Sequence, residues 1–374
     1  MTQNFPMAHW VEAGQEHNAR WRSGSGTPPP RRLMTADDRM SADAAWRLAS
    51  EGTALLWRGD FQNARLLLQA MARRADRKPR KAAASPRDAF NLQRQAQAQR
   101  ARTLGMLLLP FDAGHAIPLR RAPDVRQACE EAYGPAAEPY LASLRELQGI
   151  IGAHEWRKKG VEIPELQARI HPHYGVFSPV RGEYVQLVAQ APLPARTLAF
   201  DIGTGTAVLA ALLARRGVER VVATDADPRA LACARDNIGR LGLGDKVELA
   251  QADLFPPGRA PLVVCNPPWV PARPSSPLEH AVYDPDSRML RGFLDGLAAH
   301  LEPGGEGWLI LSDLAEHLEL RPRAELLAMI EAAGLRVAGR ADVRPRHPRA
   351  SDPSDPLHAA RALEVTSLWR LTAG

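Results

Sequence analysis

The chain has 374 residues, of which 45% are hydrophobic, which is enough for about two domains with sizeable cores. Its formal net charge is +6, and no apolar run approaches the roughly 20 residues that a membrane span needs. Residues 1–30 lack the apolar core of a secretion signal, and the three cysteines, Cys129, Cys233 and Cys265, have neither metal-ligand nor disulfide spacing. We therefore expect a cytoplasmic protein without a membrane segment, a disulfide or a metal site.

The positive charge is concentrated in the first half of the chain. Residues 1–170 hold 26 basic and 18 acidic side chains, whereas residues 171–374 hold 22 and 24. A basic surface can bind a polyanion such as RNA. However, 43 of the 48 basic residues are arginine, a bias that base composition can also produce, so nucleic acid binding is one of two interpretations.

Three segments are expected in chain order. Residues 1–34 are polar and end in a Ser-, Gly- and Pro-rich stretch, which predicts a disordered tail. Residues 35–170 carry helical patterns, with Ser41, Asp60 and Ser85-Pro86 as candidate helix starts, and predict a mainly helical domain. A basic linker over 72–87 interrupts this domain. The third segment is 171–374, and it begins with a Pro- and Gly-rich loop in which His171 and His173 have no third metal ligand nearby.

The clearest pattern in the chain is a glycine-rich turn between two acidic residues. It consists of strand 198–200, Asp201, Gly203, Gly205, helix 208–213, strand 221–224 and Asp225. A helical crossover of this kind joins parallel strands, and glycine lets backbone N–H groups approach a ligand closely. An acid about 20 residues after the glycines lies where dinucleotide-binding folds bind a ribose hydroxyl, so an NAD site is one alternative.

A second motif follows two further predicted strands. Strand 247–250 leads to Asp253, and strand 262–265 is followed at once by Asn266-Pro267-Pro268-Trp269. Two prolines cannot continue a central strand, because each lacks an N–H group. They also fix the backbone and leave bare carbonyls at the carboxyl end of the strand, where ligands bind in open α/β sheets.

These motifs resemble those of a known enzyme class. The glycine turn resembles motif I, DxGxGxG, of class I S-adenosylmethionine (SAM) methyltransferases, with Ala207 in place of the third glycine. The NPPW tetrapeptide resembles the (N/D)PP(Y/F/W) motif of methyltransferases that modify planar nitrogens, and residues 175–183 are similar to the GVxxPRxxTE segment of release-factor glutamine methyltransferases. The resemblance covers about 171–374 and implies a Rossmann-like α/β fold, with a seven-stranded sheet whose last strand is antiparallel.

The resemblance also implies roles for individual residues. In that family the Asn side chain and the first Pro carbonyl accept hydrogen bonds from the target amino group, and the aromatic ring stacks on its plane. The residues implied to be catalytic are Asn266, Pro267 and Trp269, with Pro268 in contact with the substrate. Those implied to bind SAM are Asp201, Gly203, Gly205, Asp225, Asp253 and Asn266. An amide or base nitrogen is a poor nucleophile because its lone pair is delocalised, so positioning would carry most of the catalysis.

The implied function is SAM-dependent N-methylation of a macromolecule, most like glutamine methylation of a release factor, with 35–170 as the substrate-recognition domain. A base N-methyltransferase of ribosomal or transfer RNA is the alternative among enzymes. A catalytically silent SAM-fold module that binds RNA is the alternative from another class. The acid–Gly–x–Gly order together with NPPW favours SAM over NAD.

The remaining elements complete the predicted sheet. They are a helix capped by Asp286, strand 308–311, helix 322–333, strand 335–339 and strand 363–371. The long connection 341–361 would leave from the same edge as NPPW, and it carries Arg344, Arg346 and Arg349 among prolines. We expect these arginines and the linker 72–87 to contact a polyanionic substrate; a disordered loop is the alternative.

Overall fold

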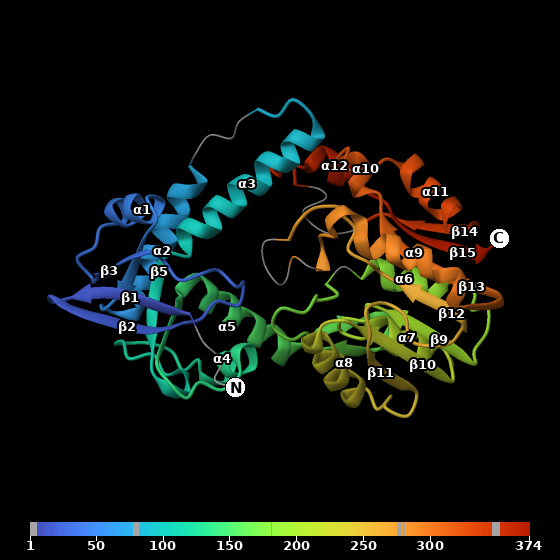
Figure 1. Ribbon diagram of the computed structural model, residues 1–374, viewed down its shortest axis with the longest axis horizontal. Coiled ribbons are helices and arrows are strands. Elements are labelled where there is room, and N and C mark those ends of the chain that lie inside the picture. Colours follow the sequence, from blue (N-terminus) through green and yellow to red (C-terminus); the bar gives the residue numbers. More distant parts are fainter. Residues whose placement is uncertain (1–5, 78–81, 181, 275–278, 280, 346–351) are drawn as a thin grey trace. The chain divides into compact units, whose positions relative to one another are not determined.

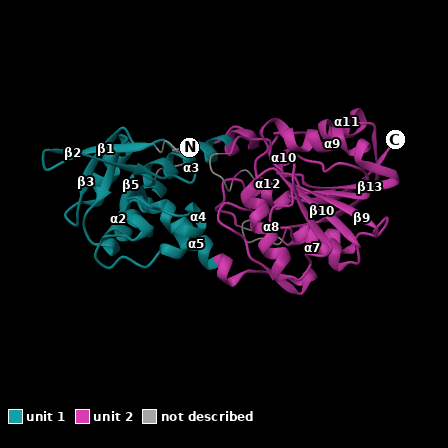
Figure 2. Cartoon of the chain, turned by 60° about the horizontal axis from the view of Figure 1, so that its bottom comes forward, with its two compact units in different colours: residues 1–82, 91–155 teal, residues 83–90, 156–374 magenta. Residues whose placement is uncertain are grey.

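The computed structural model describes residues 6–77, 82–180, 182–274, 279, 281–345 and 352–374. They form two compact units (Figures 1 and 2), with residues 1–82 and 91–155 in unit 1 and residues 83–90 and 156–374 in unit 2. The predicted boundary at residue 170 is too late, because Val161, Ile163 and Ile170 are part of the unit 2 core. Within the described ranges, every helix is too short or too polar to span a lipid bilayer.

Unit 1 is built on a six-stranded sheet with the order β1-β2-β6-β5-β4-β3. The strands are β1 (Met7–Glu12), β2 (Gln15–Trp21), β3 (Arg32–Ala36), β4 (Thr53–Trp57), β5 (Leu107–Phe111) and β6 (Tyr140–Ser143). Strands β3, β4 and β5 are parallel, whereas β1–β2 and β5–β6 are antiparallel pairs. Because β1 also contacts β3, at the other end of the strand order, the sheet curls around a core that includes Trp21, Leu56 and Leu108.

The helices of unit 1 follow local signals in the sequence. They are α1 (Ala42–Ser50), α2 (Phe61–Asp76), α4 (Arg126–Tyr133) and the short η1 (Ala113–His115). Two further helices are shared with unit 2, which contains the first residues of α3 (Pro86–Leu104) and the last residues of α5 (Leu144–Lys159). The predicted caps are confirmed: Ser41 Oγ accepts from the N–H of Ala44 at 3.2 Å, and Asp60 Oδ1 accepts from that of Gln62 at 2.8 Å. The helix α3 begins at Pro86, as predicted.

The prediction of a disordered tail over 1–34 is wrong for residues 6–34, and residues 1–5 lie outside the described residues. The prediction of a mainly helical domain over 35–170 is not confirmed, because unit 1 is built on a six-stranded sheet. Strands β1 and β2 and the start of β3 lie in the predicted tail. Contacts far along the chain hold it in place: Arg22 donates to the carbonyl of Pro135 at 3.0 Å, and the N–H of Gly24 donates to Glu146 at 2.6 Å. Local composition carries no information about such partners, which lie 113 and 122 positions away.

The predicted basic linker is also shorter than expected. The helix α2 ends at Asp76 and α3 begins at Pro86, so both ends of 72–87 are helical. Residues 78–81 of this linker lie outside the described residues.

Unit 2 contains the predicted seven-stranded sheet, with the order β11-β10-β9-β12-β13-β15-β14. Its strands are β9 (Leu198–Ile202), β10 (Arg220–Asp225), β11 (Val247–Gln251), β12 (Ala260–Cys265), β13 (Leu301–Ser312), β14 (Leu335–Val343) and β15 (Thr366–Ala373). As expected, β15 runs opposite to the other six strands of this described sheet, which are parallel to one another. A small separate hairpin, β7 (Val161–Ile163) and β8 (Ala168–Ile170), precedes the sheet.

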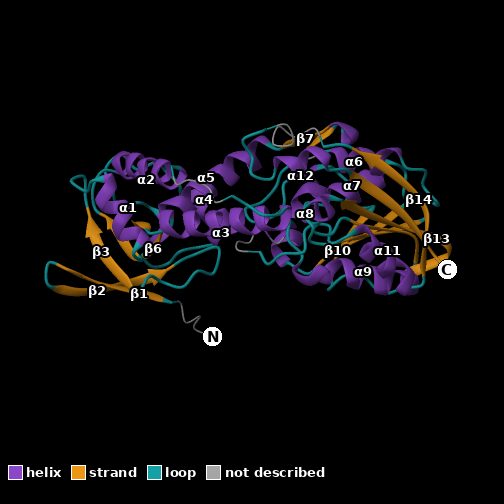
Figure 3. Cartoon of the chain, turned by 90° about the horizontal axis from the view of Figure 1, so that it is seen from above, coloured by secondary structure: helices purple, strands orange, loops and turns teal. Residues whose placement is uncertain are grey.

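Helices cover both faces of this sheet. They are α6 (Glu183–Gln190), α7 (Val208–Arg215), α8 (Pro228–Arg240), α9 (Arg288–His300), α10 (Leu314–His317), α11 (Arg323–Ala332) and α12 (His358–Leu363), with the short η2 (Pro164–Leu166) and η4 (Pro285–Ser287). Figure 3 shows α6 and α7 on one side of the strands and α9 and α11 on the other. The two faces have separate apolar cores, one around Ala199, Val264 and Ile310 and one around Phe200 and Cys265.

The predicted cap of α9 is wrong. Asp286 has a left-handed backbone, with φ of 56°, and lies in η4. The carboxylate that caps α9 belongs to Asp284, which is buried and accepts from the N–H groups of Met289 at 3.0 Å and Leu290 at 3.1 Å. The two extra residues of the turn place the capping acid earlier in the sequence than a standard N-cap.

Candidate active site

The candidate site lies at the edge of the unit 2 sheet where four neighbouring parallel strands end. In the strand register, Ile202 of β9 pairs with Thr224 of β10 and with Cys265 of β12. The glycine turn and the NPPW tetrapeptide each begin one residue after Ile202 or Cys265, so they leave the sheet side by side. At the same edge, Asp225 is the last residue of β10, and Asp253 lies two residues after the end of β11.

The glycine turn has the backbone that its sequence requires. Gly203 has φ of 70° and Gly205 of 56°, values that glycine adopts without strain. A Cβ at Gly203 would collide with the methyl group of Met289, whereas one at Gly205 would meet no atom within 4 Å. Ala207, in place of the third motif glycine, also has a left-handed φ of 62° and is fully buried at the start of α7. Its departure from the motif therefore strains the backbone.

Asp201 is buried beneath this turn, with 2% of its surface exposed. Its Oδ2 accepts from the hydroxyl of Thr204 at 2.6 Å and from the N–H of Ala210 at 3.1 Å, which joins the turn to α7. Burial raises the pKa of Asp201 to about 6, against the opposing effect of these two hydrogen bonds. The carboxyl therefore supports the turn directly.

The second motif acid, Asp225, is joined to the turn. Its Oδ2 accepts from the N–H of Gly205 at 3.0 Å, and its Oδ1 accepts from the N–H of Asp227 at 2.9 Å, where α8 begins. Burial raises its pKa, although these hydrogen bonds oppose the shift. Asp253 differs, because it is exposed and forms an ion pair with Arg288 at 2.9 Å.

The first residue of α6 and the segment before it contain polar atoms that fit a polar cofactor. Within the described ranges, Ser178 Oγ and Glu183 Oε1 are buried without a hydrogen-bond partner. An unpaired buried polar atom is unfavourable, and a ligand can supply the missing partner. Burial raises the pKa of Tyr184, and the charges of Asp201 and Glu183 raise it further. Both carboxyl groups are therefore close enough to Tyr184 to act on its hydroxyl. These atoms suit the ammonium and carboxylate groups of SAM.

The NPPW tetrapeptide is held by its own side chains. The indole N–H of Trp269 donates to Oδ1 of Asn266 at 2.8 Å, and both residues are half-buried. The carbonyl of Trp269 accepts from the buried guanidinium of Arg321 at 3.2 Å, and Arg321 also donates to the hydroxyl of Ser287 at 3.0 Å. The structure thus fixes the plane of the indole and the orientation of the Asn266 amide together.

The expected arginine loop is described only at its start. The strand β14 is antiparallel to β15, which is antiparallel to β13, so β14 is parallel to β13 and ends at the same edge as NPPW. Arg344 follows it directly and is exposed, as predicted for a solvated loop. Arg346 and Arg349 lie outside the described residues, and three strands, β13, β15 and β14, lie beyond β12 in the sheet order.

The two histidines before the turn have structural partners. His171 Nδ1 lies 2.6 Å from the carbonyl of Arg157, and His173 Nε2 lies 3.1 Å from Asp236 Oδ2. Among the described residues, no three His, Cys, Asp or Glu side chains are grouped as a metal site would require.

Sequence reasoning missed several residues that shape the site. Arg321 and Asp284 lie in loops whose sequence has no motif, and Thr204 is one of the unassigned positions within the turn. Asn237 could have been noticed, because it is a polar residue on the apolar side of α8, with Leu231, Ala234 and Ile238. A buried asparagine on a helix needs hydrogen-bond partners, and those partners point to what the helix holds.

Comparison with known proteins identifies the class. Residues 185–267 match the family model described as ribosomal protein L11 methyltransferase (PrmA). The chain is 38% identical over 145 residues to the release factor glutamine methyltransferase of Cereibacter sphaeroides. This match covers 37% of this chain and 49% of that protein. It is 30% identical over 224 residues to the ribosomal protein L11 methyltransferase of Pelotomaculum thermopropionicum, which covers 59% of this chain and 65% of that protein.

A solved structure was also matched, that of a SAM-dependent methyltransferase from Thiobacillus denitrificans in complex with S-adenosyl-L-homocysteine, with a TM-score of 0.35 and 16% identity over 53% of this chain and 92% of that one. The strand order, the glycine turn and the sequence matches together show that unit 2 is a class I SAM-dependent methyltransferase domain. Its relatives include release factor glutamine methyltransferases and ribosomal protein L11 methyltransferases. The chain spans about half the length of the first of these relatives.

Proposed function

We propose that this protein transfers a methyl group from SAM to a planar amide nitrogen of a translation protein, with a glutamine side chain as the acceptor. The observation that carries the proposal is the hydrogen-bonded pair of Asn266 and Trp269 at the carboxyl end of β12, where Asn266 leaves the sheet level with Gly203 of the glycine turn. The names of two relatives, a release factor glutamine methyltransferase and a ribosomal protein L11 methyltransferase, support a protein acceptor.

The residues of the NPPW tetrapeptide would position the acceptor nitrogen. A carbonyl-type oxygen has two lone pairs, so Asn266 Oδ1 can accept one hydrogen bond from Trp269 and a second from an acceptor –NH₂ group. The carbonyl of Pro267 would accept the other hydrogen, Pro268 would line the substrate, and the face of Trp269 would stack on the amide plane. Bound SAM supplies an electrophilic methyl group. Orientation of the nitrogen by two acceptors reduces delocalisation of its lone pair, which is the main barrier to attack.

We assign cofactor binding to residues around the turn. The backbone of Gly203 and Gly205 would approach SAM, the carboxylate of Asp225 would bind its ribose hydroxyls, and Asp201 would lie towards its ammonium group. Asp253 is exposed and paired with Arg288, so it would have to release that ion pair to bind the adenine amino group. Such an exposed pair is weak.

We assign recognition of the acceptor to unit 1 and to the loop that begins at Arg344. Translation components are cytoplasmic, which agrees with the expected location. If the acceptor is ribosome-bound, Arg344, Arg346 and Arg349 would contact its RNA, and replacement of all three by alanine should reduce the salt dependence of binding.

The test is transfer of tritiated methyl groups from SAM to purified release factors, to ribosomal protein L11 and to ribosomal and transfer RNA. Protease and nuclease digestion then locate the label, and mass spectrometry identifies the methylated residue. We expect label in protein, on a glutamine amide, and none with the Asn266→Ala variant, which should still bind SAM. Label only in RNA would assign the chain to base methylation, and SAM binding without transfer to any acceptor would favour a silent binding module.

A further inference from the structure

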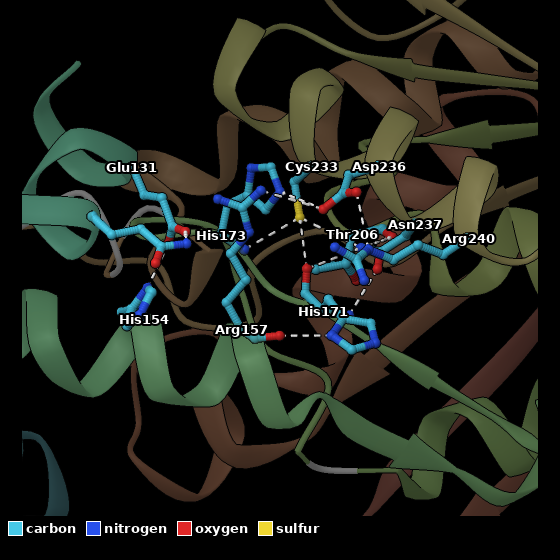
Figure 4. A network of polar contacts seen from close by, with 11 residues as sticks. Glu131, His154, Arg157, His171, His173, Thr206, Cys233, Asp236, Asn237 and Arg240 are labelled. Atoms are coloured by element: carbon cyan, nitrogen blue, oxygen red, sulfur yellow. Dashed lines mark hydrogen bonds and ion pairs between the residues drawn. The ribbon is translucent and has the colours of Figure 1, made fainter. Parts of the chain in front are cut away.

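The segment that precedes the glycine turn is fastened to one face of α8 (Figure 4). The N–H of His173 donates to Sγ of Cys233 at 3.4 Å, and Sγ of Cys233 lies 3.6 Å from the carbonyl of His171. Val176 packs against Ala230 and Cys233 in a small apolar cluster. The segment 171–176 therefore follows α8 over two of its turns.

Asn237 lies at the centre of this arrangement and has no exposed surface. Its Oδ1 accepts from the N–H of His171 at 2.7 Å, and its Nδ2 lies 3.3 Å from the carbonyl of His171. The same Nδ2 lies 3.2 Å from the carbonyl of Thr206, in the glycine turn. One side chain thus binds the backbone of two segments that are 35 positions apart in the sequence.

The two segments are those that carry the polar groups suited to SAM. On one side, the chain continues from His171 to Ser178 and Glu183, whose buried oxygen atoms lack partners among the described residues. On the other, Thr206 follows Gly205, whose N–H is bound to Asp225. The relative position of these groups depends on the contacts between the segments, and Asn237 supplies hydrogen bonds to both.

We propose that Asn237 is a positioning residue for SAM binding, whose amide holds the segment 171–180 and the glycine turn together as one cofactor-binding surface. Asn237 itself does not touch the cofactor. It fixes the backbone of His171 in the way that a paired strand would, and it ties that backbone to Thr206. This role concerns the cofactor and holds whichever acceptor the enzyme methylates.

Charged side chains next to Asn237 must be considered in any test at different pH values. Asp236, next to Asn237, accepts from Arg240 at 2.9 Å and lies 3.4 Å from Arg157 as well as near His173. Burial alone would raise the pKa of Asp236, but the hydrogen bonds from His173 and Arg240 lower it. Because the wild type and the variants share this cluster, every comparison between pH values is a ratio to the wild type at the same pH.

The test compares three variants by calorimetric titration with S-adenosylhomocysteine. Asn237→Ala removes the bridge, and we expect the Kd to rise about tenfold, the effect of one lost hydrogen bond. Cys233→Ala is the matched control, because Cys233 binds the same segment one helical turn earlier, and its Sγ also lies 3.5 Å from Asn237 Nδ2. Among the hydrogen bonds of the described residues, those of Cys233 do not reach the glycine turn, whereas Asn237 binds Thr206. The Kd of Cys233→Ala should stay within about twofold of the wild type, a change too small to represent a hydrogen bond.

Asn237→Asp adds a readout that a purely structural role would not produce. At pH 8 its carboxylate would face the carbonyls of His171 and Thr206 without a proton to donate, so cofactor binding should be weakened. Burial raises the pKa of such a carboxyl, and at pH 5.5 its proton can restore one of the two bonds. The Kd ratio to the wild type should therefore fall on acidification. Hydrogen exchange of residues 171–177 should be faster in this variant at pH 8 and slow again at pH 5.5.

The outcomes separate clearly. Equal affinities for folded Asn237→Ala and Cys233→Ala would overturn the proposal, as would a Kd ratio for folded Asn237→Asp that does not change with pH. Failure of both Asn237 variants to fold at either pH would also overturn it, by assigning Asn237 to fold stability alone. Because no acceptor is present in these titrations, the results are independent of the proposed methyl acceptor.

Discussion

Replacement of Asp201 by asparagine tests the electrostatics of the glycine turn. Asp201 has 2% of its surface exposed, and burial raises its pKa from 3.8 to about 6. Oδ2 of Asp201 accepts both from the N–H of Ala210 and from the hydroxyl of Thr204, and the amide oxygen of an asparagine can accept the same two hydrogen bonds. The substitution therefore removes the charge and keeps the shape.

Whether the Asp201→Asn substitution stabilises or destabilises the fold follows from the direction of the pKa shift. A carboxyl whose pKa is raised by folding favours the protonated form in the folded state, so its charge destabilises the fold at high pH. This destabilisation is absent below pH 3.8, develops as the pH rises and is complete above about pH 6. At about 1.4 kcal/mol for each pH unit between the two pKa values, the full effect is about 3 kcal/mol.

We expect the Asp201→Asn variant to gain stability over the wild type by about 3 kcal/mol at pH 8 and by much less at pH 4. Urea titrations at several pH values give the free energy of unfolding. When unfolding is detected by hydrogen exchange of peptides from β9, the titrations report on unit 2 alone. Asp236→Asn is the control with the opposite sign, because the pKa of Asp236 is lowered and its charge stabilises the fold at neutral pH. A stability difference for Asp201→Asn that stays constant from pH 4 to pH 8 would refute the reasoning.

Three further substitutions test separate parts of the site. Asp225→Ala should weaken SAM binding by about 1.5–3 kcal/mol in calorimetry, the range for charge-assisted hydrogen bonds, and an unchanged Kd would remove Asp225 from the cofactor site. Ala207→Gly relieves a left-handed φ of 62° but loses a buried methyl group, so the thermal midpoint of unit 2 should rise by only a few degrees, which corresponds to about 1 kcal/mol; a fall would show that packing outweighs strain. Trp269→Phe keeps the ring but removes the donor to Asn266, and it should lower kcat roughly tenfold without changing the Kd for SAM; wild-type kcat in a steady-state assay with the identified acceptor would show that the indole N–H has no role.

Unit 2 could be predicted well because its signals are local. Acid, glycine turn and helix occur within a dozen residues, and Pro267 and Pro268 mark the end of β12 in the sequence itself. Parallel strands in an α/β sheet end at one edge, so these motifs were correctly expected to lie together. Asp284 shows the limit: the cap of α9 comes from a residue that the local helix-start rule does not consider.

Unit 1 could not be predicted because its strands depend on distant partners. The strand β2 pairs with β6, and the register joins Arg20 to Tyr140. The strand β1 is exposed at alternate positions, and it is rich in neither β-branched residues nor long apolar runs. Hydrophobic periodicity is informative only when one face is consistently buried by neighbours. The partner of β2 is β6, which follows four α-helices later in the sequence, α1 to α4, so no local pattern can reveal the pairing.

The two acids at the turn explain why a cationic cofactor suits this site. Burial raises the pKa of both Asp201 and Asp225, and the charge of Asp225 raises that of Asp201 further. A ligand with a sulfonium and an ammonium group offsets both charges, whereas the pyrophosphate of NAD would add like charge near them. If Asp201 lies towards the ammonium group, acidification through about pH 6 should protonate it and weaken SAM binding. Calorimetry between pH 5 and pH 7 should show this decline in the wild type and its absence in Asp201→Asn, while tight NAD binding or a pH-independent Kd in the wild type would contradict the assignment.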